Sequence, residues 1–148
     1  WMQVFVSAAF HAYASDQVRA DLIQAFKWWK TSPDREFKSP FFGKDSGTAK
    51  PSVNGKKHLL RHCHLIPLHD AEALAKWVKN LRWHSRKTSD RVLVYVQRDD
   101  DYFLIDVVDD PGAHQIMRMF DKNGKSFMLS CAQSAEAFLN RELELEPA

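Results

Sequence analysis

The sequence has few of the residues on which several classes of protein depend. Its two cysteines, Cys63 and Cys131, are too few for a disulfide framework and form no CxxC pair, so we expect a reducing cytoplasm. The five glycines form no phosphate-binding loop, and neither HEXXH nor GxSxG occurs. No apolar run approaches the ~20 residues of a membrane span. The sequence thus argues against P-loop, zincin, α/β-hydrolase and membrane proteins.

A strong excess of one charge is also lacking. Lys and Arg total 21 against 19 Asp and Glu, a formal +2, which is too mild to indicate a nucleic-acid binder by charge alone. The charges are unevenly spread, however. Cations are in excess from Lys27 to Arg91, and the chain ends in the acidic "ELELEP". The middle of the chain could therefore contact a polyanion.

The length and the apolar patterns predict one α+β domain over residues 1–148. With 45% hydrophobic residues, 148 residues can bury a real core. Alternating and helical periodicities predict these strands and helices: strands at 2–6, 57–66, 91–97, 102–108 and 126–130, and helices at 16–30, from Asp70 to Arg82, at 111–119 and at 133–143. Residues 31–57 are rich in Pro, Ser, Gly and Lys and predict a long loop, and 140–148 an acidic tail that frays. We expect an antiparallel sheet of about four or five strands with helices packed on one face.

Three of the seven histidines lie in "HLLRHCHLIPL", residues 58–68. Strand alternation separates this segment into Leu59, Cys63 and Leu65 on one side and His58, His62 and His64 on the other. If the apolar sides of all the strands face the helices, the remaining face is polar. That open face would carry together His62, His64, Arg91, Tyr95 and Asp106.

Two chemistries could use such a face. His-x-His on a strand is a known metal-ligand geometry, but the further candidate ligands follow no recognised spacing: His58, His84, Asp90 and Asp106. Metal-free RNA cleavage needs a base for the 2′-OH, an acid for the 5′-oxygen and cations at the phosphate, which histidine and arginine supply. Tyr95 could stack on a base. His114 and Arg118 fit this inventory, or simply one exposed side of a surface helix.

The order of the motifs resembles the YafO family of toxin–antitoxin toxins. The similarity runs from "MQVF" (2–5) to "AEAFL" (135–139). Between them come the matching segments "FFGKD" (41–45), "RHCHL" (61–65), "SRKTSD" (85–90), "LVY" (93–95) and "PGAHQIMR" (111–118).

This resemblance implies a ribosome-dependent mRNA interferase with a small, distantly RelE-like fold, whose exposed sheet face holds RNA without a metal or other cofactor. Carried onto this chain, it implies as catalytic residues His62, His64, Arg91, His114 and Arg118. The residues expected to hold RNA are Lys44, Arg61, Arg86, Lys87 and Tyr95. The partners would be a cognate antitoxin, mRNA and the ribosome with its rRNA, with no membrane involved.

Two alternatives stay open from the residues themselves. The first is a non-catalytic module of the same fold that binds RNA or the ribosome and blocks translation without cutting. The second is a metal-dependent hydrolase built on His62 and His64.

Overall fold

The computed structural model describes residues 2–48, 50–56 and 59–148, and its centre is a five-stranded mixed sheet of order β1-β5-β4-β3-β2. The strands are β1 (Gln3–Val6), β2 (Phe42–Thr48), β3 (Leu60–Leu65), β4 (Val92–Arg98) and β5 (Asp101–Val108). β1 runs parallel to β5, and the other neighbours are antiparallel. The predicted α+β class is confirmed, although the sheet is not antiparallel throughout.

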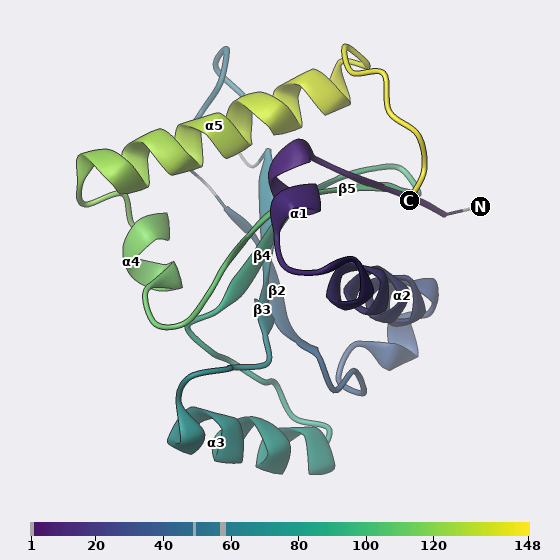
Figure 1. The fold of residues 1–148 in the computed structure, drawn as a ribbon, viewed down its shortest axis with the longest axis vertical. Helices are drawn as coiled ribbons and strands as arrows, with labels where there is room; N and C mark the ends of the chain where they lie inside the picture. Colours follow the sequence, from purple (N-terminus) through teal and green to yellow (C-terminus); the bar gives the residue numbers. More distant parts are fainter. Residues whose placement is uncertain (1, 49, 57–58) are drawn as a thin grey trace.

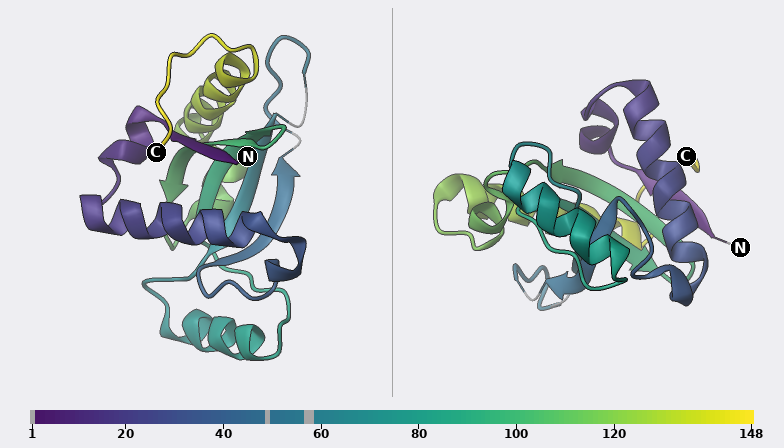
Figure 2. Two further views of the ribbon diagram at one scale, coloured as in Figure 1. Left: turned by 90° about the vertical axis from the view of Figure 1, so that its right-hand side faces the viewer. Right: turned by 90° about the horizontal axis from the view of Figure 1, so that it is seen from below.

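The helices lie on both faces of this sheet and at one end of it. They are α1 (Ala8–Ala12), α2 (Asp16–Thr31), α3 (Ala71–Arg82), α4 (Ala113–Met117) and α5 (Lys122–Leu139), with a 3-10 turn, η1 (Pro33–Arg35). α1 and α2 cover one face, α4 and α5 the other, and α3 stands at the end (Figures 1 and 2). The prediction of helices on one face only is wrong, because both sheet faces carry a buried apolar cluster.

Two helix starts that the sequence predicts are confirmed by their caps. The Ser15 hydroxyl accepts a hydrogen bond from the backbone N–H of Val18 (3.3 Å) at the start of α2. The Asp70 carboxylate accepts from Glu72 and Ala73 at the start of α3, each at 3.0 Å. Such side-chain acceptors satisfy donors that the first turn of a helix leaves unpaired.

Residues 31–57, predicted as a loop, contain η1 and the edge strand β2. β2 is polar and carries a register shift, so it shows no apolar alternation, and its place depends on pairing with β3. Gly43 allows this edge to pass close to its neighbours, because a Cβ there would collide with the Lys87 carbonyl and approach the Trp77 ring to 2.9 Å.

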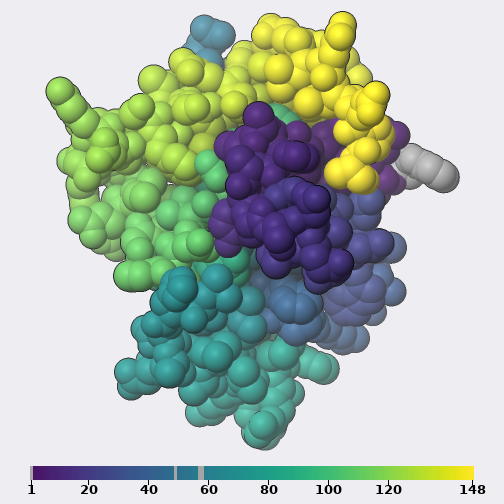
Figure 3. Space-filling view, in the orientation of Figure 1, coloured from purple at the N-terminus to yellow at the C-terminus, as the bar shows by residue number. Residues whose placement is uncertain are grey.

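The C-terminal region differs most from the prediction. The predicted strand at 126–130 and the predicted helix at 133–143 are replaced by the continuous helix α5, Lys122–Leu139. Its buried residues recur at helical spacing: Met128, Cys131, Ala132, Ala135 and Phe138. The tail after α5 returns to β1, where the N–H of Ala148 donates to the Val4 carbonyl (2.7 Å) and Lys27 Nζ to the Ala148 oxygen (2.9 Å). Figure 3 shows this yellow tail against the purple N-terminal region.

The β3–β4 register decides which side chains share a face. His62 lies opposite Val94 and His64 opposite Val92, whereas Arg61 lies opposite Tyr95. Directly opposed residues in a ladder point to the same side. The predicted open face is therefore wrong as a set: the two histidines lie on the α4–α5 side, and Tyr95 lies on the α2 side. Asp106, opposite Val94, joins the histidine side.

Candidate active site

Three imidazoles from β3 and α4 gather on the α4–α5 side of the sheet. The ring centroids of His62 and His64 are 6.1 Å apart, and those of His64 and His114 are 5.2 Å apart. Lys44 of β2 is exposed beside them, and its charge lowers the pKa of both His62 and His64. The structure thus brings together His62, His64, His114 and Lys44, which the sequence proposed from three separate segments.

His114 is held by a carboxylate. Its Nδ1–H donates to Asp90 Oδ1 at 2.8 Å, and no described residue bonds to its Nε2. Burial acts to raise the pKa of Asp90, but hydrogen bonds from the backbone N–H groups of His114 and Gly112 outweigh it, so this pKa lies below its ordinary value. A carboxylate that holds Nδ1–H leaves Nε2 as the proton acceptor of the ring.

The same carboxylate fixes the start of α4. Asp90 Oδ2 accepts from the N–H of Gly112 (2.5 Å), and Asp90 Oδ1 accepts from the N–H of His114 (2.9 Å). The sequence predicts a helix from residue 111. Asp110 accepts from the backbone of Leu68 and His69, and α4 begins at Ala113 instead.

Arg118 lies near His114 at the edge of this site. Both line an open hollow of about 530 Å³ together with Asp90 and Phe120. The Arg118 guanidinium lies 6.0 Å from the centroid of the exposed Phe120 ring and forms no ion pair with a described residue. Among the described residues, Arg118 is thus a cation without an ion-pair partner beside the His114–Asp90 pair.

His62 has both ring nitrogens occupied by hydroxyls of β2. Nδ1 is 2.7 Å from Thr48 Oγ1, and Nε2 is 3.3 Å from Ser46 Oγ. Burial lowers the pKa of His62 to about 4, although the Asp45 carboxylate acts in the opposite direction. The ring is therefore neutral at pH 7.

His64 is held from behind. Its Nδ1 accepts a hydrogen bond from the backbone N–H of Ser89 at 2.8 Å. Burial, and then the charges of His114, His62 and Lys44, lower the pKa of His64 to about 4. This ring is also neutral at pH 7.

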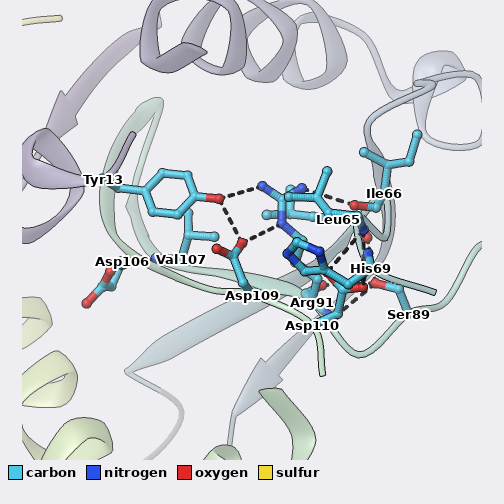
Figure 4. Close-up of polar contacts among 11 residues, drawn as sticks. Tyr13, Leu65, Ile66, His69, Ser89, Arg91, Asp106, Val107, Asp109 and Asp110 are labelled. Atoms are coloured by element: carbon cyan, nitrogen blue, oxygen red, sulfur yellow. Dashed lines mark hydrogen bonds and ion pairs between the residues drawn. The ribbon is translucent and has the colours of Figure 1, made fainter. Parts of the chain in front are cut away.

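Arg91 does not join the histidines. Its side chain is directed toward the α2 side, as Figure 4 shows, and is almost fully buried. Nε donates to Asp109 Oδ1 (2.8 Å), Nη1 to the Ile66 carbonyl (3.0 Å) and Nη2 to the Tyr13 hydroxyl (2.7 Å). Since each nitrogen of the guanidinium already donates within the protein, little remains for a phosphate.

Tyr95 and Arg61 belong to a second polar cluster on the α2 side. The Tyr95 ring is 0% exposed and packs edge-on against Phe26. Its hydroxyl donates to Asp45 (2.7 Å) and accepts from Arg61 Nε (3.2 Å), while Lys30 Nζ lies 2.6 Å from the same carboxylate. A fully buried ring offers no surface on which a base could stack.

The remaining predicted RNA contacts differ in exposure. Lys87 is 1% exposed, with its Nζ 5.6 Å from the Trp77 ring centroid and no hydrogen-bond partner in the part of the chain that the structure describes. Burial lowers its pKa. Arg86 is exposed in the loop between α3 and β4. Of this pair, only Arg86 is available to a ligand.

The structure also bears on metal binding and on the reactivity of the Cys63 thiol. Over residues 2–48, 50–56 and 59–148, no group of three or more His, Cys, Asp or Glu side chains is placed to hold a metal ion. His58, a predicted member of the histidine face, lies outside the described residues. Cys63 is buried on the α2 side, and burial raises its thiol pKa well above the ordinary value.

Several residues of this site were not predicted in their observed roles. The sequence offers Asp90 only as a candidate metal ligand, and its patterns assign no role to Ser46, Thr48 or Ser89. Asp90 lies two residues before the start of β4, and His114 lies in α4, which follows β5. Neighbouring strands place them together, so the antiparallel β4–β5 pairing is the feature that could have indicated their contact.

Comparison with known proteins agrees with the order of the motifs. A family model described as toxin YafO of type II toxin–antitoxin systems matches residues 27–140, more than half of the chain. No curated protein and no solved structure matches the chain. Within the described residues, no helix is long and apolar enough to cross a membrane. The chain therefore belongs to the YafO family of toxins from type II toxin–antitoxin systems, a membership that implies an antitoxin as its partner.

Proposed function

We propose that this toxin is an endoribonuclease that cuts mRNA on the ribosome by acid–base chemistry at the 2′-OH. The observation that carries the proposal is His114: Asp90 holds its Nδ1–H at 2.8 Å, and Nε2 is left for a substrate. A base oriented by a carboxylate is the arrangement that general base catalysis requires. Membership in a toxin family supplies the biological setting.

In this mechanism His114 Nε2 takes the proton of the 2′-OH. The freed oxygen attacks the neighbouring phosphorus, the P–O5′ bond breaks, and a 2′,3′-cyclic phosphate forms. The half-exposed Asp90 carboxylate accepts from Nδ1–H and stabilises the imidazolium that results. General base catalysis of this kind contributes about 10²- to 10⁴-fold to the rate.

The surrounding cations serve the phosphate. Arg118 shares the hollow with His114 and stabilises the negative charge that develops on the phosphate oxygens. Lys44 is exposed beside His62 and His64, and we assign to its ammonium group the proton that the leaving 5′-oxygen takes up. His62 is neutral at pH 7 because its pKa is about 4, so a role as proton donor is not expected of it.

The modest net charge supports the role of the ribosome. With a formal charge of +2, the protein gains little electrostatic attraction to free RNA, since such affinity grows with the number of phosphates neutralised. A ribosome that presents the mRNA removes the need for tight binding to free RNA.

Expression of variants tests the proposal. Wild type should arrest growth and create new 5′ ends on mRNA, mapped by primer extension, whereas His114→Ala and Asp90→Asn should do neither at equal protein level. His11→Ala, an exposed histidine of α1, is the matched control and should stay toxic. Arrest by wild type without new 5′ ends would indicate the non-catalytic inhibitor. Full cleavage by His114→Ala would refute the assigned base.

A further inference from the structure

Ser89 is fixed in place behind His64. The Ser89 hydroxyl donates toward the Leu65 carbonyl (2.5 Å) and the Arg91 carbonyl (3.0 Å), and it accepts from the Arg91 N–H (3.2 Å). Ser89 is itself buried. Its backbone N–H therefore keeps its direction toward His64 Nδ1, at 2.8 Å.

A backbone N–H can only donate, so His64 Nδ1 must keep its lone pair. The neutral ring then carries its proton on Nε2. Protonation would add a hydrogen to Nδ1 and turn it toward another donor. The groups facing the ring also oppose a positive charge: His114 of α4 and His62 on the same strand when they are protonated, and the ammonium group of Lys44 of β2.

The Nε2–H of His64 has no acceptor among the described residues, although the side chain is only 4% exposed. His64 Nε2 is not among the fully buried side-chain nitrogen and oxygen atoms that lack a hydrogen-bond partner in the described part of the chain. It therefore reaches the surface of the site. The neighbouring imidazole of His114 meets the ring edge-on, with centroids 5.2 Å apart. The Nε2–H donor of His64, which has no partner among the described residues, therefore lies beside the proposed base His114.

We infer that His64 acts at neutral pH as an uncharged hydrogen-bond donor, which presents Nε2–H to a non-bridging oxygen of the phosphate and transfers no proton itself. This inference rests on the proposed function and names the recognition of an anionic oxygen as the task of His64. It differs from the role that the resemblance to the YafO family implies, in which His64 is one of the catalytic residues. His64 is a binding residue, and the proton transfers belong to His114 and Lys44.

Ring ¹⁵N spectroscopy of the purified protein tests the protonation state without any use of activity. In two-bond ¹H–¹⁵N spectra, with the His64 ring assigned by its loss in His64→Gln, we expect the Nε2–H form throughout pH 5–8. An Nδ1–H form, or a protonation midpoint above about pH 6, would overturn the inference. Because this result does not depend on cleavage, it can fail while the proposed function stands.

Kinetics test the role in binding. His64→Ala should weaken binding of a ribosome-presented mRNA with a 2′-deoxy nucleotide at the cleavage site, and slow cleavage of the ribose form, each by about 10- to 100-fold, as expected for one hydrogen bond to a charged group. His64→Gln keeps an N–H donor and should recover part of the loss. The shape of the pH–rate profile should not change in either variant. Loss of one limb of that profile in His64→Ala would mean that His64 transfers a proton, and it would overturn the inference. His11→Ala is the control.

Discussion

Substitution of Arg91 separates a structural role from a catalytic one. The resemblance to the YafO family implied that Arg91 acts on the phosphate, but its guanidinium donates to Asp109, Ile66 and Tyr13 on the side of the sheet away from His114. We therefore expect Arg91→Ala to reduce stability and to leave the chemistry of each folded molecule largely intact.

The size of the loss follows from these contacts. The Asp109 side chain is 43% exposed, so solvent screens its ion pair with Arg91. This ion pair therefore contributes about 0.5–1 kcal/mol. The hydrogen bonds to Ile66 and Tyr13 add about 0.5–1.5 kcal/mol each. The aliphatic stem is buried, so truncation also loses its transfer free energy and adds a cavity cost that decreases when the neighbouring side chains relax. Together we expect a decrease of about 2–4 kcal/mol in the free energy of unfolding.

The assay is urea unfolding followed by tryptophan fluorescence, carried out in a non-toxic His114→Ala background. Arg82→Ala is the matched control, since Arg82 is exposed on α3, and its change should stay below about 0.5 kcal/mol. Cleavage per folded molecule, measured with an intact His114, should fall less than about 10-fold in Arg91→Ala. Unchanged stability together with a loss of cleavage above about 100-fold would refute the structural assignment.

Three further expectations concern the cations, the buried tyrosine and acid pH. Lys44→Arg keeps the charge but holds its proton, so mRNA binding should persist while cleavage slows by about 10²-fold or more; equal cleavage rates would exclude Lys44 as the acid. Tyr95→Phe removes the hydroxyl that donates to Asp45 and should cost about 1–2 kcal/mol in urea unfolding with cleavage unchanged; a large loss of cleavage in a folded variant would restore the stacking role. For His62 and His64 the folded pKa of about 4 lies below the ordinary 6.5, so between these values the unfolded chain binds more protons. The free energy of unfolding should therefore be flat above pH 6.5 and should fall by about 1–3 kcal/mol between pH 6.5 and pH 4. The decrease should be smaller in His64→Gln. An increase in the free energy of unfolding as the pH falls from 6.5 to 4 would contradict the neutral imidazoles.

The fold was predictable where a segment carries its own pattern. Ser15 and Asp70 cap helices that also have apolar periodicity, and the β4 and β5 segments alternate or are continuously apolar. β2 cannot be found this way, because only its first two residues are buried and the polar remainder is placed by pairing with β3. The α5 segment failed for a different reason: its "NGK" suggests a turn, yet Asp121 caps a helix that includes these residues.

The site was predictable by residue type but not by arrangement. The sequence singled out His62, His64 and His114 as candidates, and these rings are neighbours. Alternation assigns the two faces of each strand separately and so groups Arg91 and Tyr95 with the histidines, whereas the register between β3 and β4 determines which residues share a face. The tie between His114 and Asp90 depends on tertiary structure, since these residues are 24 positions apart in the chain.

The chemistry of the cut ends tests the central claim most directly. mRNA cleaved by the purified toxin on programmed ribosomes should carry a 2′,3′-cyclic phosphate and a 5′-hydroxyl, and a 2′-deoxy nucleotide at the cleavage site should abolish the cut. Asp90→Asn should yield these ends at a rate lower by about 10²- to 10⁴-fold, because an amide no longer holds His114 with Nε2 free to accept a proton. A 5′-phosphate end, or cleavage of the 2′-deoxy substrate, would contradict attack by the 2′-oxygen and the role assigned to His114.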